Sequence, residues 1–181
     1  MNKIFKKVKT NDVSYLFSAP NGVPGDITRV DESSVEPAMQ AIQGSDYPVP
    51  GMGVKYTSDG SGIQVPSGDA ATAFAGVMVR EVPQQSNSSA ADQTFVPGTP
   101  LITVPVGLMV RGYASVICVA GTPVRGGVVY WQVTDHSGVK AGSFRADGTD
   151  SGNAVALTAT QAEWASNGLD ASNNAEIRVA R

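Results

Sequence analysis

The sequence predicts an all-β protein, an antiparallel sandwich or jelly-roll-like barrel with long loops and little helix. Among its 181 residues are 20 glycines and 11 prolines, whereas only 16% of the residues are charged. Turn-forming residues are therefore plentiful, and long amphipathic helices have little material from which to form. The longest apolar and β-branched segment, Leu108–Trp131, is typical of buried strands.

The Leu108–Trp131 segment is interpreted as two strands of one buried sheet. Glycine and proline between Gly121 and Gly127 supply the turn that would connect them. Because apolar residues occupy both sets of alternating positions, we expect these strands to be covered on both faces. The predicted core contains Val77, Val79, Val110, Val116, Ile117, Val119, Val128, Val129 and Val133.

Turn signals punctuate the rest of the chain at the regular spacing found in sandwiches and barrels. They delimit predicted short strands at residues 27–30, 54–56 and 63–65, followed by a longer core strand at 73–82. Polar residues bounded by prolines then predict a long loop at 83–100, of a kind that is usually functional or mobile. The strand pattern resumes at Leu101, and residues 20–181 are therefore predicted to form a single β domain.

The carboxyl-terminal part of the chain predicts a hairpin. Residues 162–166 would pair with residues 175–179 across a loop rich in Asn, Asp, Gly and Ser. This pairing would place the ring of Trp164 beside Ile177 and Val179, where it can enter the core.

Two sequences fit the capping-box pattern of a helix start. They are Ser33-x-x-Glu36 and Thr160-x-x-Glu163. Pro37 follows the first and Asn167-Gly168 closes the second, so each place can hold one short helix at most.

Charge is distributed unevenly along the chain. The formal net charge is −3, yet the first ten residues carry four lysines, which leaves nine basic and 16 acidic residues in the remainder. Residues 1–19 are therefore predicted to be a basic arm on an acidic body, serving either as a solvated tail or as a contact to an acidic surface of a partner. The arm residues proposed to make contact are Lys3, Ile4, Phe5, Lys6, Lys7, Val8 and Lys9.

The same composition argues against nucleic-acid and membrane partners. An acidic body repels phosphate, and aromatic residues are not interleaved with basic ones beyond Phe5. No apolar run approaches the length of a membrane span, and no apolar stretch typical of a secretory signal follows the lysines.

The sequence offers no convincing catalytic, cofactor or metal site. His136 is the only histidine and lies in a turn-like segment, where adjacent residues such as Ser137 cannot converge as a triad. Cys118, the only cysteine, has apolar neighbours and is predicted to be a buried, inert thiol. Asp147–Gly152 lacks the glutamate of a calcium loop and predicts a hairpin tip, and Asp31-Glu32 would point to opposite faces of a strand.

Several blocks resemble the head cement, or capsid decoration, proteins of tailed bacteriophages. The resemblance spans roughly residues 20–180, and its most specific part is Arg111-Gly112-Tyr113 followed by a Gly-Thr-Pro-x-x-Gly-Gly-x-Val-Tyr block that ends at Tyr130. The other matching blocks are residues 24–29, 74–83 and 175–179. The basic opening of the chain has no counterpart in this pattern.

This resemblance implies a non-enzymatic virion structural protein, made in the host cytoplasm. Proteins of this kind bind the outside of an icosahedral capsid and bridge and stabilise neighbouring subunits. The expected partners are the major capsid protein and further copies of the chain, as a homo-dimer or homo-trimer. Two alternatives are a virion-surface β-module that binds carbohydrate and a small hydrolase using Ser137 and His136. The first is disfavoured because Tyr113, Tyr130 and Trp131 lie in apolar strand contexts.

Overall fold

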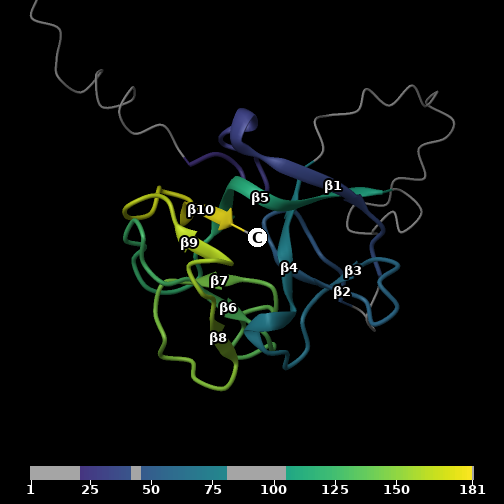
Figure 1. Ribbon diagram of the computed structural model, residues 1–181. Coiled ribbons are helices and arrows are strands. Elements are labelled where there is room, and N and C mark those ends of the chain that lie inside the picture. Colours follow the sequence, from purple (N-terminus) through teal and green to yellow (C-terminus); the bar gives the residue numbers. More distant parts are fainter. Residues whose placement is uncertain (1–20, 42–45, 81–104, 181) are drawn as a thin grey trace, which may run out of the picture.

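The described part of the chain folds into two antiparallel sheets with almost no helix (Figure 1). The computed structural model describes residues 21–41, 46–80 and 105–180. In the larger sheet the strands follow the order β3-β2-β4-β5-β10-β9, with β1 also paired to β5, and in the smaller sheet the order is β7-β6-β8. This architecture confirms the predicted antiparallel sandwich. The predicted arm at 1–19 and the predicted loop at 83–100 lie outside the described residues.

The strands are short, and glycine-containing turns separate them. The only helical elements in the described part are two 3₁₀ turns, η2 (Val30–Glu32) and η3 (Ala71–Ala73). The strands are β1 (Ser34–Ala38), β2 (Gly53–Tyr56), β3 (Ile63–Gln64), β4 (Phe74–Val79), β5 (Val106–Ile117), β6 (Tyr130–Gln132), β7 (Phe144–Arg145), β8 (Ala154–Ala156), β9 (Ala162–Trp164) and β10 (Asn174–Ala180).

Strand β5 is the longest strand and organises the larger sheet. Its first half pairs with β1 and β4, and its second half pairs with β10. Between the two halves Gly112 has φ +130°, and a Cβ there would overlap the hydroxyl of Ser33. The position therefore requires glycine. The side chains of β5 contribute to two cores: Met109, Ala114 and Val116 belong to the larger one and Leu108 belongs to the smaller one.

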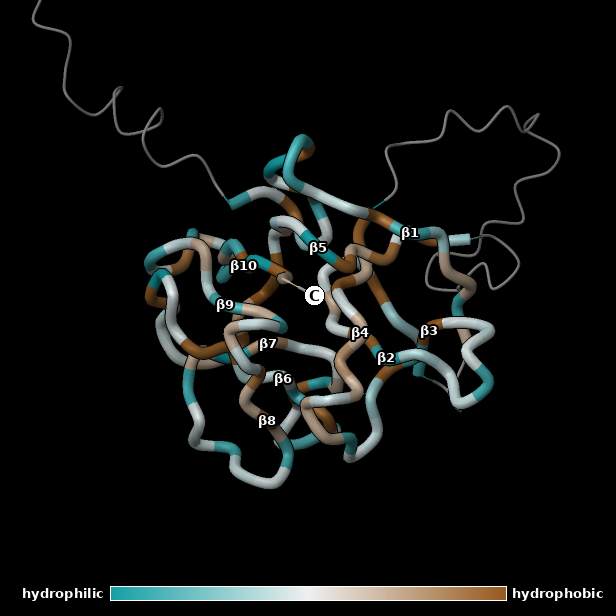
Figure 2. The backbone as a smooth tube through the Cα atoms, in the orientation of Figure 1, coloured by the Kyte–Doolittle hydropathy of each residue, from teal (hydrophilic) through white to brown (hydrophobic). Residues whose placement is uncertain are grey.

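Isolated bridges connect the two sheets. Cys118, directly after β5, pairs in parallel with Phe144 of β7, and Val128, shortly before β6, pairs with Glu163 of β9. The smaller sheet is thus held to both ends of the β5-β10-β9 layer, as in a partly closed barrel. The hydrophobic segments in Figure 2 lie mainly on the strands, and hydrophilic ones lie mainly on the connecting turns.

The larger core is centred on aromatic side chains. The ring of Phe74 makes edge contacts with Trp131 and Phe144, at centroid distances of 5.3 and 6.3 Å. The Trp131 indole N–H donates to the carbonyl oxygen of Gly53 at 3.2 Å, which satisfies its only polar atom. A Cβ on Gly53 would clash with the rings of Trp131 and Phe144. The close approach of β2 to these two rings therefore depends on this glycine.

The predicted core is correct in part. Val77, Val79, Val116, Val129 and Val133 are buried as expected, and Val110 is half-buried.

Three other predicted core residues are exposed, which corrects the expectation. The exposed fractions are 44% for Ile117, 37% for Val119 and 50% for Val128. After Ser115 only one face of the strand is covered by other described residues. Val116 and Cys118 lie on this buried face, whereas Ile117 and Val119 lie on the opposite, exposed face.

The pairing of the Leu108–Trp131 segment also differs from the prediction. Its two strands, β5 and β6, belong to different sheets and do not pair with each other. Asp147–Gly152 is not a hairpin tip either, because it connects β7 to β8, which lie on opposite sides of β6. Local turn signals place a connection in the chain but do not determine which strands it joins.

The predicted strand at 27–30 is not formed, which corrects a further expectation. Of the predicted strand at 27–30, only Ile27 makes a bridge, with Ala114, and Val30 begins the turn η2. Neither capping-box sequence starts an α-helix: Ser33-x-x-Glu36 enters β1, and Thr160-x-x-Glu163 enters β9. Pairing to β5 and β10 outweighs the weak local preference in both places.

The predicted carboxyl-terminal hairpin is confirmed. Strands β9 and β10 pair antiparallel, with Trp164 opposite Ile177 and Ala162 opposite Val179. All four side chains are buried, and the ring of Trp164 contributes to the larger core as expected.

Candidate interaction surface

Strand β1 is an exposed strand at the surface of the larger sheet (Figure 1). Among the strands of the described part it pairs only with β5, and its first four residues are exposed on both faces. Pro37 lies within it, as is common at sheet edges, where a missing N–H costs no ladder bond. Unpaired backbone groups and exposed side chains along one strand can bind an extended segment of another chain.

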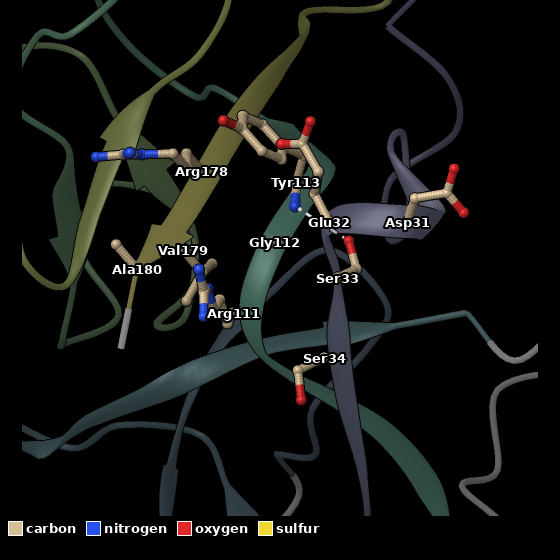
Figure 3. Close-up of a pocket in the computed structure, with 10 residues that line it drawn as sticks. All are labelled: Asp31, Glu32, Ser33, Ser34, Arg111, Gly112, Tyr113, Arg178, Val179 and Ala180. Atoms are coloured by element: carbon tan, nitrogen blue, oxygen red, sulfur yellow. Dashed lines mark hydrogen bonds between the residues drawn. The ribbon is translucent and has the colours of Figure 1, made fainter.

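Beside the start of β1 the surface forms an open groove of about 670 Å³ (Figure 3). Turn η2 and the beginning of β1 form one wall, the Gly112 region of β5 forms the floor, and the end of β10 forms the other wall. The lining residues are Asp31, Glu32, Ser33, Ser34, Arg111, Gly112, Tyr113, Arg178, Val179 and Ala180.

Charges of opposite sign line the two sides of this groove. Asp31 and Glu32 are exposed on η2, Glu36 follows on β1, and none of the three forms an ion pair with another described residue. These three carboxylates are called the acidic strip below. Across the groove, Arg178 points away from η2 and lies 3.0 Å from the Glu163 carboxylate (Figure 3).

The wall that carries the acidic strip is anchored by an arginine. The Arg29 guanidinium lies 3.9 Å above the centre of the Tyr113 ring and 3.0 Å from the carboxylate of Glu176 on β10. The hydrogen bond to Glu176 raises the pKa of Arg29 above its ordinary value. The Ser33 hydroxyl donates to the Arg29 carbonyl at 2.7 Å. The turn is thereby fixed against β5 and β10.

Asp31 and Glu32 were expected to lie on opposite faces of a strand. The structure corrects this, because both lie in a 3₁₀ turn and both are exposed. The acidic strip was therefore not predicted from the sequence. The sequence shows three carboxylates close together in the chain, but their common exposure depends on how η2 and β1 lie on β5. The predicted contact residues of the arm, from Lys3 to Lys9, are outside the described residues.

The only histidine lies beside an aspartate that is distant in the sequence. The Nδ1 atom of His136 is 2.9 Å from Oδ1 of Asp150, and the Ser137 hydroxyl oxygen is 3.4 Å from Nδ1 and 3.3 Å from Nε2. An oxygen almost equidistant from both ring nitrogens lies over the ring, outside the plane in which either nitrogen's lone pair or N–H points. The arrangement therefore lacks the directed serine–histidine bond of a catalytic triad.

Asp150 instead belongs to a structural network. Its carboxylate accepts hydrogen bonds from Gln132 at 2.9 Å, Asn153 at 3.0 Å and Arg145 at 2.9 Å. The hydrogen bonds from Gln132, which contributes most, and from Asn153 lower the pKa of Asp150 to about 2. The buried Arg145 also contacts Asp147, which ties the loop after β7 to the smaller sheet.

The remaining candidate for chemistry is the thiol of Cys118. Its side chain is buried, and its sulfur donates to the carbonyl oxygen of Ala120 at 3.2 Å. Burial raises the pKa of this thiol, which disfavours the reactive thiolate.

Within residues 21–41, 46–80 and 105–180, no group of three or more His, Cys, Asp or Glu side chains is placed to hold a metal ion. No helix in this described part is long and apolar enough to span a membrane.

An all-β body with an exposed strand and an open, charged groove has the features of a protein that works by binding other proteins. The similarity of this chain to known proteins shows its family. Residues 13–179 match the family model of the XM1 gp53 minor capsid protein, and the chain belongs to this family.

A solved structure has the same fold. A chain in the capsid of Myoviridae phage XM1 superposes with a TM-score of 0.60 at 18% sequence identity, over 98% of this chain and 95% of that chain. No curated protein matches. The family assignment confirms the predicted phage capsid-associated protein and gives this chain a structural role as a component of the virion capsid.

Proposed function

We propose that the protein binds the outer surface of the assembled capsid, contacts the major capsid protein and bridges neighbouring subunits. The observation that carries this proposal is β1, an exposed strand on a chain that belongs to a minor capsid family. Pairing of β1 with an extended segment of a capsid subunit would provide backbone hydrogen bonds, and Val35 and Tyr56 would add apolar contact.

Repetition makes such a contact effective. A shell presents the same site many times, and a unit that holds two subunits at once gains from effective concentration. Even a contact of about 800 Å² per partner then suffices for stable attachment. Assembly of the protein as a symmetric dimer or trimer would multiply these contacts further.

The basic arm supplies a second contact in this proposal. Lys3, Lys6, Lys7 and Lys9 would lie on an acidic surface of a capsid subunit or of a neighbouring copy. The acidic strip supports the second possibility, because every copy of the chain carries this exposed surface of opposite charge.

Attachment is tested by co-sedimentation with assembled heads that lack this protein. The wild-type protein is expected to sediment with the heads in many copies and to raise the temperature at which they release DNA. Val35→Lys, which places a charge on β1, is expected to lower occupancy at least tenfold. Val124→Lys is the matched control, since Val124 is also exposed but lies far along the chain from β1. Failure of the wild-type protein to sediment with the heads, or full occupancy by the Val35 variant, would contradict the proposal.

A further inference from the structure

The amino-terminal segment of the described chain runs along β5 in the opposite direction. Ile27 bridges Ala114, and the N–H of Gly25 donates to the carbonyl oxygen of Ser115 at 2.8 Å. Further back, a Cβ on Gly22 would lie 3.6 Å from the Cβ of Ser115, so that the backbone of the segment covers this side chain. As the chain is followed toward its amino end, it therefore moves toward the end of β5.

Along β5 this segment covers successive side chains of one face. Tyr113 lies under Arg29 and Ser115 under Gly22, and both belong to the set of alternating residues that also includes Ile117 and Val119. Ser115 is completely buried, whereas the next two members of the set are exposed. The cover thus stops where the described chain begins.

The first described residue is fixed next to the uncovered part of that face. The side-chain amide of Asn21 donates to the carbonyl oxygen of Asn174 at 2.8 Å, and Asn174 lies opposite Ile117 in the β5-β10 ladder. The backbone N–H of Asn21 also donates to the Asp170 carboxylate at 3.0 Å. The residues that precede Asn21 therefore start within reach of Ile117 and Val119.

Those preceding residues have the required chemistry. In the sequence Val13-Ser14-Tyr15-Leu16-Phe17, four of the five residues are apolar, and Val13, Tyr15 and Phe17 would share one face of an extended segment. An extended chain advances about 3.4 Å per residue, so the four residues from Phe17 to Asn21 can span about 14 Å and the eight from Val13 about 27 Å. The family match begins at residue 13 and therefore includes this segment, whereas Lys3, Lys6, Lys7 and Lys9 lie outside it.

We propose that residues 13–17 dock on the apolar surface of Ile117 and Val119 of the same chain and extend the cover that Arg29 and Gly22 begin. The free arm then consists of residues 1–12, and the basic side chains leave the body at the β9–β10 end. This docking does not depend on capsid binding.

Protection of the segment tests the proposal in the full-length protein. Chymotrypsin cleaves after Tyr15, Leu16 and Phe17, and we expect this cleavage and the exchange of the amides of residues 13–17 to be slow in the wild type. Ile117→Ser combined with Val119→Ser is expected to accelerate both at least tenfold, because the apolar contact is lost. The matched control combines Val30→Ser with Val124→Ser, two exposed valines elsewhere, and is expected to leave both rates unchanged. Equal rates in the wild type and the Ile117/Val119 variant would overturn the proposal.

Disulfide cross-linking provides a second measurement that does not require the surface to be weakened. In a Cys118→Ala background, Val119→Cys is combined in turn with Val13→Cys, Tyr15→Cys and Phe17→Cys. At least one pair is expected to form a disulfide within the monomer under mild oxidation. A disulfide found only between two copies, or no disulfide with any pair, would overturn docking within one chain.

Discussion

Gly25 and Gly51 pack against each other at the corners of two Pro-Gly turns. Each has φ +89°, and a Cβ on Gly25 would lie 2.5 Å from the Cβ of Pro50, just as one on Gly51 would lie 2.7 Å from the Cβ of Pro24. Both turns are also bonded to the end of β4, since the Gly51 N–H donates to the Met78 carbonyl and the Arg80 N–H donates to the Gly25 carbonyl. The paired turns therefore join the amino-terminal segment to the larger sheet.

Gly51→Ala is expected to lower the free energy of unfolding by about 1 to 3 kcal/mol or more, because it adds steric overlap to an unfavourable positive φ. Denaturant unfolding measures the change. Gly60→Ala is the matched control: Gly60 also has a positive φ, but nothing lies within 4 Å of its Cβ position. An equal loss of unfolding free energy in the two variants would show that the contact between the two turns does not stabilise the fold.

Ile177→Ala is expected to cost about 2 to 5 kcal/mol, since it removes a fully buried side chain from the larger core. Val128→Ala, at a position that the sequence also predicted to be buried, is expected to cost less than about 0.5 kcal/mol because the side chain is half exposed. Thermal unfolding of the two variants distinguishes these outcomes. A large loss for Val128→Ala would contradict the exposure of this position.

Asp150 is expected to make stability depend on pH in the acid range. Its pKa in the folded protein is about 2, below the ordinary value of 3.8 that applies to the unfolded chain. Its contribution is therefore complete above about pH 4 and is lost as the pH falls toward 2, because the unfolded chain binds the proton first. Unfolding midpoints in urea at pH 7, 4 and 2.5 measure this effect.

Asp150→Asn is expected to be less stable than the wild type at pH 7, with a difference that shrinks as the pH falls to 2.5. Asp31→Asn serves as the control, since Asp31 is exposed and forms no ion pair with a described residue. A difference between Asp150→Asn and the wild type that stays constant with pH would contradict the role of the ionised carboxylate.

Deletion of residues 1–9 is expected to weaken capsid attachment roughly tenfold to a hundredfold without unfolding the body, since exposed ion pairs each contribute about 0 to 1 kcal/mol. Replacing the four lysines by glutamine reproduces this loss if electrostatic attraction dominates, and the loss is then larger at low salt. Phe5→Ala reproduces it if an apolar anchor dominates. Binding to heads at two salt concentrations separates the two mechanisms, and full occupancy by the truncated protein would show that the arm is only a tail.

Cys118→Ala and His136→Ala are expected to leave capsid binding within a few-fold of wild type. The thiol is buried, and the imidazole contacts the Asp150 network without a directed bond from Ser137. Co-sedimentation of the folded variants with heads measures this directly. Loss of binding by a folded His136 variant would give this residue a functional role.

Much of the local structure could be read from the sequence. Glycine and proline signals located the turns, and the alternation around Trp164 and Ile177 correctly predicted the β9–β10 hairpin, because the two strands are close in the chain and share one short loop. The fold class and the phage capsid family also followed from the sequence. The acidic strip did not, because the common exposure of Asp31, Glu32 and Glu36 depends on a 3₁₀ turn that tertiary contacts hold in place.

The amino-acid sequence around Ile117 predicts a strand with apolar residues on both faces, but long-range packing selects the face that is buried. Val116 and Cys118 face the core, whereas Ile117 and Val119 face outward. A run of apolar residues without alternation does not indicate which face of the strand is buried. Likewise, the sheet to which β6 belongs depends on strands that are far away in the chain. Such choices are set by long-range packing, in which Phe74, Trp131 and Phe144 from three separate strands meet in one core.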